Sequence, residues 1–581
     1  MSGTAAISSL SQATRPSIAG WKQVHSYCSL TVAVLLCLLP FSGRAFHIDD
    51  PLFVWAGQQI AKHPLDPYGF QVTWDNYAEP MSEITKNPPL ACYYIAAIGT
   101  VAGWSERALH LGFLIPALAM VLGTYRLALR FTRLPMLAAA ATLLTPGVMV
   151  SATSVMCDTM MLALWIWAAI LWIEGLDRNK ISYLTGSAVL LGLAALTKYF
   201  ALALLPLLLV YSIFRKKKPG VWALFLLIPV ALLGTYQLGT AMKYGHAMFS
   251  QAFQFSRAER GVNGTPSLFA DALVAFSFTG GCTLSALLLA PFTWRWKVMA
   301  ASLATAGICT AIFAHGWIRL GHYDVLLRTA FGNAPFATGI QLALLVAAGF
   351  LVIILSCVEL QNWRDSNSIF LGLWVLGTFI FAGFVNWSVN ARSVLPLIPA
   401  VGMLLARRID AKLEVSPGLK KRLALSLALS GAISLWITKA DSDWANSARS
   451  AAQAIHQQTQ SLHIPVWFEG HWGFQYYMQQ YGARPMDFVK SSTSAGDLLV
   501  VPQSNALAYT MPSAQYVASA EVLQLKLQQP VFTMHWRRGA GFYSSFYGFL
   551  PFVFAAPSPE QYYVLQLAKP WDARLTERTK N

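Results

Sequence analysis

The sequence predicts an all-α polytopic membrane protein with about thirteen transmembrane helices and a small exported α/β domain at its C-terminus. Of its 581 residues, 55% are hydrophobic and 12% are charged, whereas a soluble domain carries about 25% charged residues. The apolar residues form blocks of about 17–25 residues, which is the length that crosses a hydrocarbon core of about 30 Å. These two observations leave too little polar surface for a water-soluble protein of this size.

The distribution of the positive charge indicates a membrane rather than a nucleic-acid partner. The net charge is +16, but the cations cluster in short runs between apolar blocks, as at Arg215 to Lys218. Cytoplasmic loops of membrane proteins retain such cations. No basic stripe with interleaved aromatic residues is present, so we expect membrane lipids and no nucleic acid as partners. The seven cysteines lie mostly in or beside apolar blocks and predict no disulfide framework.

Charge also predicts the topology. Arg15 and Lys22 precede the first apolar block and place the N-terminus inside. With thirteen spans every strongly basic loop then faces the cytoplasm, whereas a further span at 90–104 would turn the loops 215–218 and 407–422 outward. We therefore expect 52–63 and 90–104 to be helices that lie along the interface. The predicted spans are 26–41, 107–131, 134–150, 159–173, 181–196, 200–214, 221–242, 268–292, 298–314, 335–358, 369–385, 394–405 and 423–437.

This topology divides the chain into three parts. Residues 1–25 are expected to be a disordered cytoplasmic N-terminus, and residues 26–437 the transmembrane domain, with a long outer loop at 43–104. Residues 438–581 mix polar and apolar residues and are expected to form the exported domain. Its strand-like runs are 464–469, 497–501, 521–527 and 562–567.

Two adjacent acids, Asp49 and Asp50, follow the first span directly, in the segment HIDDPLF. Carboxylates at a membrane surface are costly unless they are paired, solvated or used. One of them could act as a general base that takes a proton from an acceptor hydroxyl. The structural alternative is that one caps the helix that begins at Pro51, and the two roles can coexist.

Four further ionisable residues meet the same outer interface under this topology. Lys86 lies in KNPPL, Asp158 begins the fourth span, Lys198 lies in LTKYF and Arg392 lies in NARSVLPLIP. Each has a plain structural explanation, a snorkelling cation or a helix cap. Together they suit a sugar-carrying lipid phosphate, which needs cations for the departing phosphate and a base for the acceptor.

The order of these motifs resembles the GT-C glycosyltransferases, and specifically the family 39 group of protein O-mannosyltransferases and bacterial aminoarabinose transferases. The order is an acidic pair after the first span, then K-x-P-P-L, S-x-x-x-D, G-L-A-x-L-T-K and R-x-x-L-P-x-x-P, and it covers residues 46–405. The resemblance implies a GT-C fold and inverting transfer of a sugar from a polyprenyl-phosphate donor, without a nucleotide. The acceptor would be a lipid, a glycan or a protein hydroxyl.

The resemblance also implies roles for single residues. Asp49 would be the catalytic base, with Asp50 as the second acid of that loop and Asp158 as the acid of the second outer loop. Lys86, Lys198 and Arg392 would bind the donor phosphate, although Asn87 is an insertion beside Lys86. Relatives differ in whether a divalent metal takes part, so no metal ligand is assigned. An exported C-terminal domain resembles the bacterial members and implies the inner membrane, with the active site on the periplasmic side.

Two other functional classes fit parts of the sequence. A transporter or flippase of lipid-linked sugar intermediates would also have many spans and interfacial cations. Transporters, however, usually hold their polar groups near the bilayer midplane, often with repeats and broken helices. A non-enzymatic scaffold would leave the acids of the first loop unexplained. The glycosyltransferase hypothesis therefore predicts that Asp49, Lys86, Asp158 and Arg392 line one outward cavity.

Overall fold

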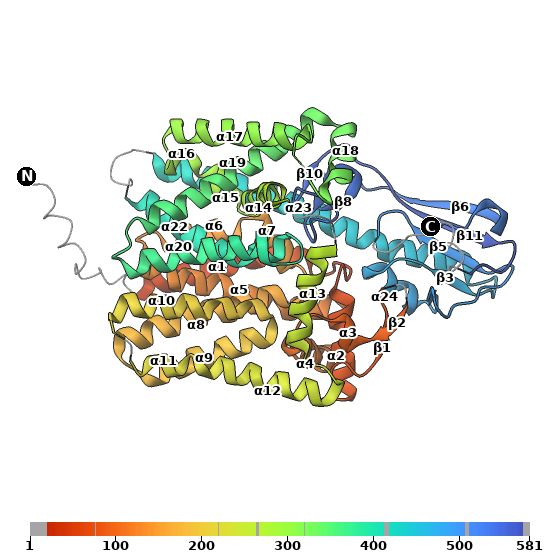
Figure 1. Cartoon of the computed structure of the whole chain (residues 1–581), viewed down its shortest axis with the longest axis horizontal. Helices are drawn as coiled ribbons and strands as arrows, with labels where there is room; N and C mark the ends of the chain where they lie inside the picture. Colours follow the sequence, from red (N-terminus) through yellow and green to blue (C-terminus); the bar gives the residue numbers. More distant parts are fainter. Residues whose placement is uncertain are drawn as a thin grey trace, which may run out of the picture.

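The computed structural model of the chain describes residues 20–75, 77–218, 220–262, 267–318, 320–411, 418–505 and 511–572. Long helices lie side by side in a bundle, and a smaller sheet-containing region covers one end of it (Figure 1). The predicted fold class, a helical membrane protein with a small C-terminal α/β region, is confirmed. The first helix, α1, begins at Gly20, so the predicted disorder of 1–25 is wrong for residues 20–25, which are helical. The rest of that segment, 1–19, lies outside the described residues.

Every predicted span coincides with helix. In the described part of the chain, nine helices are long and apolar enough to cross a membrane, or ten if the pair α6 and α7, bent by 64°, counts as one span. The other three predicted spans fall on shorter helices, α9, α14 and α22, so the count of thirteen stays a prediction. The main helices are α1 Gly20–Leu38, α5 Glu106–Phe131, α6 Pro135–Leu143, α7 Pro146–Ala152, α8 Cys157–Arg178, α9 Ile181–Thr197, α10 Leu204–Lys216, α12 Leu227–Tyr244, α14 Leu268–Cys282, α17 Trp296–Ala314, α19 Pro335–Leu360, α20 Ser366–Ile380, α22 Ile398–Asp410 and α23 Leu419–Thr459.

Side-chain contacts join all six loops that the predicted topology places in the cytoplasm, namely 130–133, 177–180, 215–218, 294–297, 359–365 and 407–422. Five are joined by ion pairs, and the sixth is joined because the guanidinium of Arg408 lies over the ring of Trp294 at 4.2 Å. These loops lie at the end of the bundle opposite the C-terminal sheet (Figure 1). The grouping of the basic loops on one side, predicted from charge alone, is therefore confirmed. The ion pairs are Arg130 with Asp177, Arg215 with Asp177, Arg133 with Asp410, and Arg407 with Glu359 and Asp365.

The outer loop 43–104 is folded into short elements. It contains α2 (Asp50–Lys62), the antiparallel hairpin β1 (Gln71–Thr73) and β2 (Ala78–Pro80), α3 (Met81–Ile84) and α4 (Leu90–Ala102). The two helices predicted here are thus present as α2 and α4. They pack closely because Gly57 has no side chain: a Cβ at this position would lie 2.8 Å from Cγ2 of Ile95.

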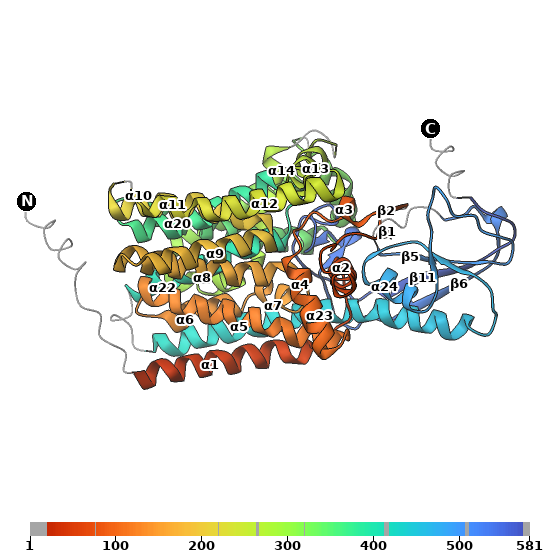
Figure 2. The same cartoon turned by 90° about the horizontal axis from the view of Figure 1, so that it is seen from below.

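The C-terminal region is an extension of the bundle. Helix α23 runs for 41 residues without interruption, or about 60 Å at 1.5 Å per residue, and passes out of the bundle beside the sheet (Figure 2). The predicted boundary at 437 and 438 therefore falls inside a helix. The sheet has the order β4-β3-β5-β11-β6, and it contains all four predicted strands. Its strands are β3 Val466–Phe468, β4 Arg484–Pro485, β5 Leu498–Pro502, β6 Val517–Leu525 and β11 Glu560–Leu567.

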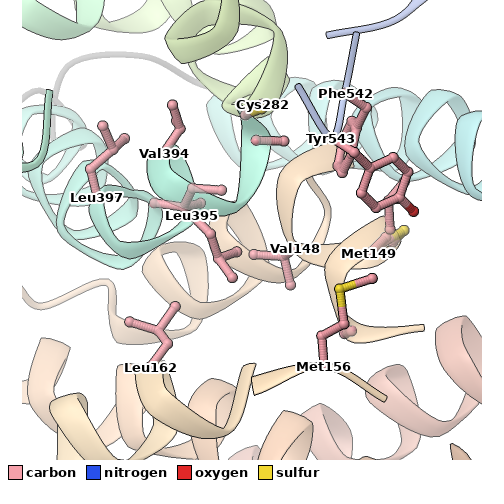
Figure 3. Close-up of a cluster of buried hydrophobic side chains, with 14 of the residues drawn as sticks. Val148, Met149, Met156, Leu162, Cys282, Val394, Leu395, Leu397, Phe542 and Tyr543 are labelled. Carbon is pink, nitrogen blue, oxygen red and sulfur yellow. The ribbon is translucent and has the colours of Figure 1, made fainter. Parts of the chain in front are cut away.

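A late segment of the chain returns to the bundle and joins its apolar core. Phe542 and Tyr543 are buried beside Val148, Met149 and Met156 (Figure 3). Their backbone is held as well, since the Phe542 carbonyl accepts a hydrogen bond of 2.8 Å from the amide of residue 391. The C-terminal region is therefore packed into the end of the bundle opposite the basic loops and not attached by a linker alone.

A buried ion pair reinforces this junction. The guanidinium of Arg44 lies 2.7 Å from the carboxylate of Asp441, and both side chains are fully buried. Arg44 also donates to the Thr153 carbonyl at 2.9 Å and to the Tyr543 hydroxyl at 3.1 Å. Thr533 and Tyr543 donate to Asp441. The outer loop, the α7–α8 connection, α23 and the C-terminal region thus meet at one pair of charges.

Replacing Arg44→Leu is expected to destabilise the protein by about 3–5 kcal/mol, because the carboxylate of Asp441 would stay buried without its partner. The free energy of unfolding in detergent measures this. The control is Arg328→Leu, which removes an exposed ion pair with Asp324 and should cost at most about 1 kcal/mol. Equal small losses in both variants would show that the buried pair contributes little.

Candidate active site

Asp49 is held by an ion pair with an arginine at the end of the bundle opposite the basic loops. Its Oδ2 accepts a hydrogen bond of 2.8 Å from the guanidinium of Arg392. The preceding residue, Ile48, is buried and has a φ of 49°, a conformation that is rare for a β-branched residue. Residues in such regions cost on the order of 1–3 kcal/mol and are often found at functional sites. The strained turn directly precedes Asp49, whose carboxylate faces Arg392.

Asp50 points the other way, into the protein. One carboxylate oxygen accepts from the amide of His47 at 2.8 Å, and the other accepts from the amide of Val155 at 3.0 Å. Asp50 therefore ties the outer loop to the turn before α8. Neither acid caps α2, because Asp49 stands at the N-cap position without a side-chain hydrogen bond there. The capping alternative for this pair is not observed.

Burial also changes the acidity of Asp50. Its side chain is fully enclosed, and this burial raises its pKa from 3.8 to about 7, against the attraction of Arg44. Asp49 adds a smaller repulsion in the same direction as burial. The two adjacent acids thus differ in environment: Asp50 is enclosed by backbone amides, whereas Asp49 is partly open to solvent, with 29% of its side chain exposed.

Asp158 and Lys198 form a second ion pair, at 2.5 Å, with the Asp158 side chain almost fully buried. Asp158 lies in the first turn of α8, whose N-cap is Met156, without a side-chain cap. Lys198 is extended after the end of α9 and leads into the short helix η3 (Tyr199–Ala203). The helix-cap alternative for Asp158 is therefore not observed either, and its carboxylate holds the Lys198 ammonium in place.

Arg392 connects the two pairs. It lies at the start of α21 (Ala391–Val394), which is capped by the side chain of Asn390. Burial acts to lower the pKa of Arg392, but the attraction of Asp49 and then of Asp158 outweighs it, so that the pKa is raised. Asp49, Asp158, Lys198 and Arg392, which we call the four-residue cluster, therefore belong to one electrostatic site.

Lys86 faces a different neighbourhood. Its ammonium donates to the Glu83 carbonyl and lies 4.9 Å from the ring centroid of Phe255. Burial lowers the pKa of Lys86, and Glu83 and Asp75 act against this shift. The following residue, Asn87, accepts a hydrogen bond from Cys157, the neighbour of Asp158. The KNPPL turn thus touches the start of α8, but no direct contact joins Lys86 to the four-residue cluster among the residues that the structure describes.

Sequence reasoning missed two residues at this site. The guanidinium of Arg392 lies 5.9 Å from the ring centroid of Tyr543, within the range of a cation–π interaction, and 2.9 Å from the sulfur of Met156. Tyr543 comes from the C-terminal region, and its hydroxyl group bonds both Arg44 and Asp441. No local pattern around Tyr543 signals this role, because its partners are distant in sequence.

The cluster combines two carboxylates with two cations, and three of its four side chains are partly exposed. Oδ1 of Asp49 makes no hydrogen bond to a described residue, which leaves it open to a hydroxyl donor. The two cations could bind an anion that competes with the carboxylates. No group of three His, Cys, Asp or Glu residues arranged for a metal ion occurs within the described ranges, so no metal ligands are assigned.

Part of the chain matches a known protein family. Residues 86–235 match the family model described as dolichyl-phosphate-mannose-protein mannosyltransferase. This range contains Lys86, Asp158 and Lys198, and it does not contain Asp49, Asp50 or Arg392. The match confirms, for this part of the chain, the resemblance that the order of the motifs indicates. The comparison with curated proteins finds no match.

Solved structures with a similar arrangement have low sequence identity. A structure of ArnT from Cupriavidus metallidurans bound to undecaprenyl phosphate is 13% identical, with a TM-score of 0.40 over 84% of this chain and 94% of that one. The same protein in the apo state is 14% identical, with a TM-score of 0.39 over 83% and 93%. The arabinofuranosyltransferase AftD from mycobacteria is 14% identical, with a TM-score of 0.33 over 76% and 29%.

The raised pKa of Asp50 predicts a pH dependence of stability. The folded protein holds a proton on Asp50 up to about pH 7, whereas the unfolded chain releases it near the usual value of about 3.9. The contribution of Asp50 to stability is therefore largest at low pH, decreases as the pH rises from about 4 to 7, and is constant above this range. The Asp50→Asn variant, which cannot ionise, should lack this decrease.

The measurement is the free energy of unfolding of both proteins in detergent at pH 5, 6, 7 and 8. The difference between the wild type and Asp50→Asn should shift in favour of the variant as the pH rises. The loss of one acceptor in the variant adds a constant offset and leaves the slope unchanged. Parallel pH profiles would mean that Asp50 is ionised throughout this range.

Proposed function

We propose that this chain is a membrane glycosyltransferase that transfers a sugar from a polyprenyl-phosphate donor to an acceptor hydroxyl at the outer end of its helix bundle. The observation that carries the proposal is the four-residue cluster. It brings an accessible carboxylate and two cations together at the end of the bundle opposite the basic loops. The match of residues 86–235 to a family of lipid-linked-sugar transferases supports the same assignment.

The cations of the cluster would bind the phosphate of the donor. Arg392 offers a planar guanidinium, which suits bidentate contact with phosphate oxygens, and Lys198 offers a point charge. Both cations are engaged by carboxylates in the structure. An incoming phosphate would compete with Asp49 for Arg392, so that donor binding releases the carboxylate. The negative charge that develops on the departing phosphate is then stabilised by cations already in position.

Asp49 would act as the general base. Its carboxylate takes the proton from the acceptor hydroxyl, and the hydroxyl oxygen forms a bond to the anomeric carbon of the sugar. The bond between this carbon and the phosphate oxygen breaks, and its electron pair leaves with the polyprenyl phosphate. Attack from the face opposite the phosphate inverts the configuration of the anomeric carbon. This sequence requires neither a nucleotide nor a covalent sugar–protein intermediate.

The remaining predicted site residues would act around this centre. Asp50 would position the strained turn through its bonds to His47 and Val155. Asp158 would hold Lys198 in place. Lys86 would meet the donor at the edge of the site, after its ammonium leaves the Glu83 carbonyl. We assign the transmembrane part, 26–437, to catalysis and the part from 438 onward to an exported region that packs Tyr543 against Arg392.

The distribution of charged residues supports a location for the site and a class of acceptor. The basic loops lie at the end of the bundle opposite the four-residue cluster. This is the arrangement expected if the end with the basic loops faces the cytoplasm. The site would then work on the periplasmic side of a bacterial inner membrane. Hydroxyl groups of a lipid, a glycan or an exported protein would be accessible there.

One observation is shared with the transporter alternative. The bend between α6 and α7 is a broken helix, which transporters often use. The break, however, is closed by hydrogen bonds from Ser430 and Ser434 to the carbonyl of Leu144. The four-residue cluster lies where helices begin or end, away from the middle of the spans. This placement favours an enzyme that works at the interface.

Replacing Asp49→Asn is expected to reduce sugar transfer by about 10²–10⁴-fold, because the amide cannot accept the acceptor proton. Transfer is measured with purified protein in nanodiscs, a radiolabelled polyprenyl-phosphate sugar and envelope extract as the source of acceptor. Binding of the donor should persist, since Arg392 and Lys198 remain.

The matched control is Asp324→Asn, which removes a partly exposed carboxylate paired with Arg328 outside the cluster. It should transfer sugar at the wild-type rate. Wild-type transfer by Asp49→Asn would remove Asp49 from the role of base and would favour a site elsewhere.

A further inference from the structure

A hollow lies between α2, the β1–β2 hairpin and α24 (Trp472–Gln480). Its volume is about 340 Å³, which is within the range of small-molecule sites. Four glutamines line it together with two aromatic rings, those of Trp55 and Phe70. We call it the glutamine groove; its glutamines are Gln58, Gln59, Gln71 and Gln479.

The groove is built on one face of α2. Trp55, Gln58, Gln59 and Lys62 follow at intervals of three and four residues, which places them on the same side of the helix. The other side of α2 is buried and packs against α4 through Gly57. The hairpin is held opposite this face by a hydrogen bond of 2.8 Å from Gln475 of α24 to the carbonyl of residue 73.

The side chains of the groove are free to bind a ligand. Those of the four glutamines make no hydrogen bond to any residue within the described ranges. An amide group both donates and accepts hydrogen bonds, as a sugar hydroxyl does. The ring of Trp55 is half-buried and fixed, with the ring centroids of Trp74 and Tyr476 at 6.3 and 6.0 Å. A rigid aromatic face suits the C–H face of a sugar ring.

The small number of charged residues in the groove indicates which class of ligand it would bind. Lys62 is the single charged residue among those that line the groove, and it lies exposed at the end of α2. A site for phosphorylated or acidic ligands would gather more than one cation, as the four-residue cluster does. Neutral, hydroxyl-rich molecules match the amides and aromatic rings better.

We propose that the glutamine groove binds a neutral oligosaccharide, namely the glycan part of the acceptor. This role in transfer rests on the proposed function. Asp49 stands at the start of the same helix, and the groove begins about 9 Å and ends about 20 Å farther along it, at 1.5 Å per residue. A sugar chain lying along α2 could therefore place its end at Asp49 while its inner residues occupy the groove.

The experiment uses the full-length protein in fluorescent nanodiscs on an array of immobilised neutral and acidic oligosaccharides. Wild-type protein should bind neutral oligosaccharides. Trp55→Ala and the double variant Gln58→Ala with Gln59→Ala should each bind about tenfold more weakly, because each loses one ring contact or a pair of hydrogen bonds. The glutamine variant disturbs the fold less than Trp55→Ala does, since the side chains of Gln58 and Gln59 make no hydrogen bond within the described residues.

The control is Trp317→Ala, which removes an exposed tryptophan outside the groove and should bind as the wild type does. Asp49→Asn should also bind normally, so a failure of catalysis is separate from a failure of the groove. The inference is wrong if the wild type binds no neutral oligosaccharide, if it binds acidic ones alone, or if both groove variants bind normally. None of these results would contradict sugar transfer by the wild type, which is measured separately.

Discussion

The buried ion pair between Arg44 and Asp441 determines how the outer end of this protein is assembled. Two charges without water are costly unless each is paired and hydrogen-bonded, and here both conditions are met by residues from four separate parts of the chain. The pair fixes the outer loop against the α7–α8 connection and draws the C-terminal region onto the bundle. Without that region, Asp441 would lose the hydrogen bonds that Thr533 and Tyr543 donate to it.

The same junction positions the four-residue cluster. Tyr543, which bonds to both members of the buried pair, also lies against the guanidinium of Arg392. The loop that follows Arg44 leads through the strained turn at Ile48 to Asp49. The two adjacent acids differ in burial. Asp50 is buried and accepts hydrogen bonds from two backbone amides, whereas Asp49 stays accessible. A rigid support of this kind lets an ion pair open for a substrate without rearrangement of the surrounding fold.

Much of this arrangement could be predicted from the sequence, because it depends on local patterns. Apolar blocks predicted the helices, basic residues predicted which loops lie together at one end of the bundle, and short β-like runs predicted the four strands. Asp49, Asp158, Lys198 and Arg392 could be grouped because each lies at the end of a span on one side of the membrane. The continuity of α23 was missed, although no glycine or proline interrupts residues 432–459.

The rest depends on contacts between distant residues, which local patterns do not specify. Arg44 and Tyr543 are 499 positions apart, and nothing near either residue indicates the other. The direction of a single side chain is equally hidden: Lys86 shares the outer interface with the cluster, but its ammonium bonds back to Glu83. The spacing of Trp55, Gln58, Gln59 and Lys62 is visible in the sequence, whereas the hairpin and α24 that face them are not.

The most direct test of the account is a cryo-EM structure of the protein in nanodiscs with added polyprenyl phosphate. We expect the phosphate group to lie within hydrogen-bond distance of both Arg392 and Lys198, and the carboxylate of Asp49 to be released from the guanidinium of Arg392. A phosphate bound at another place, with the ion pair between Asp49 and Arg392 intact, would contradict it.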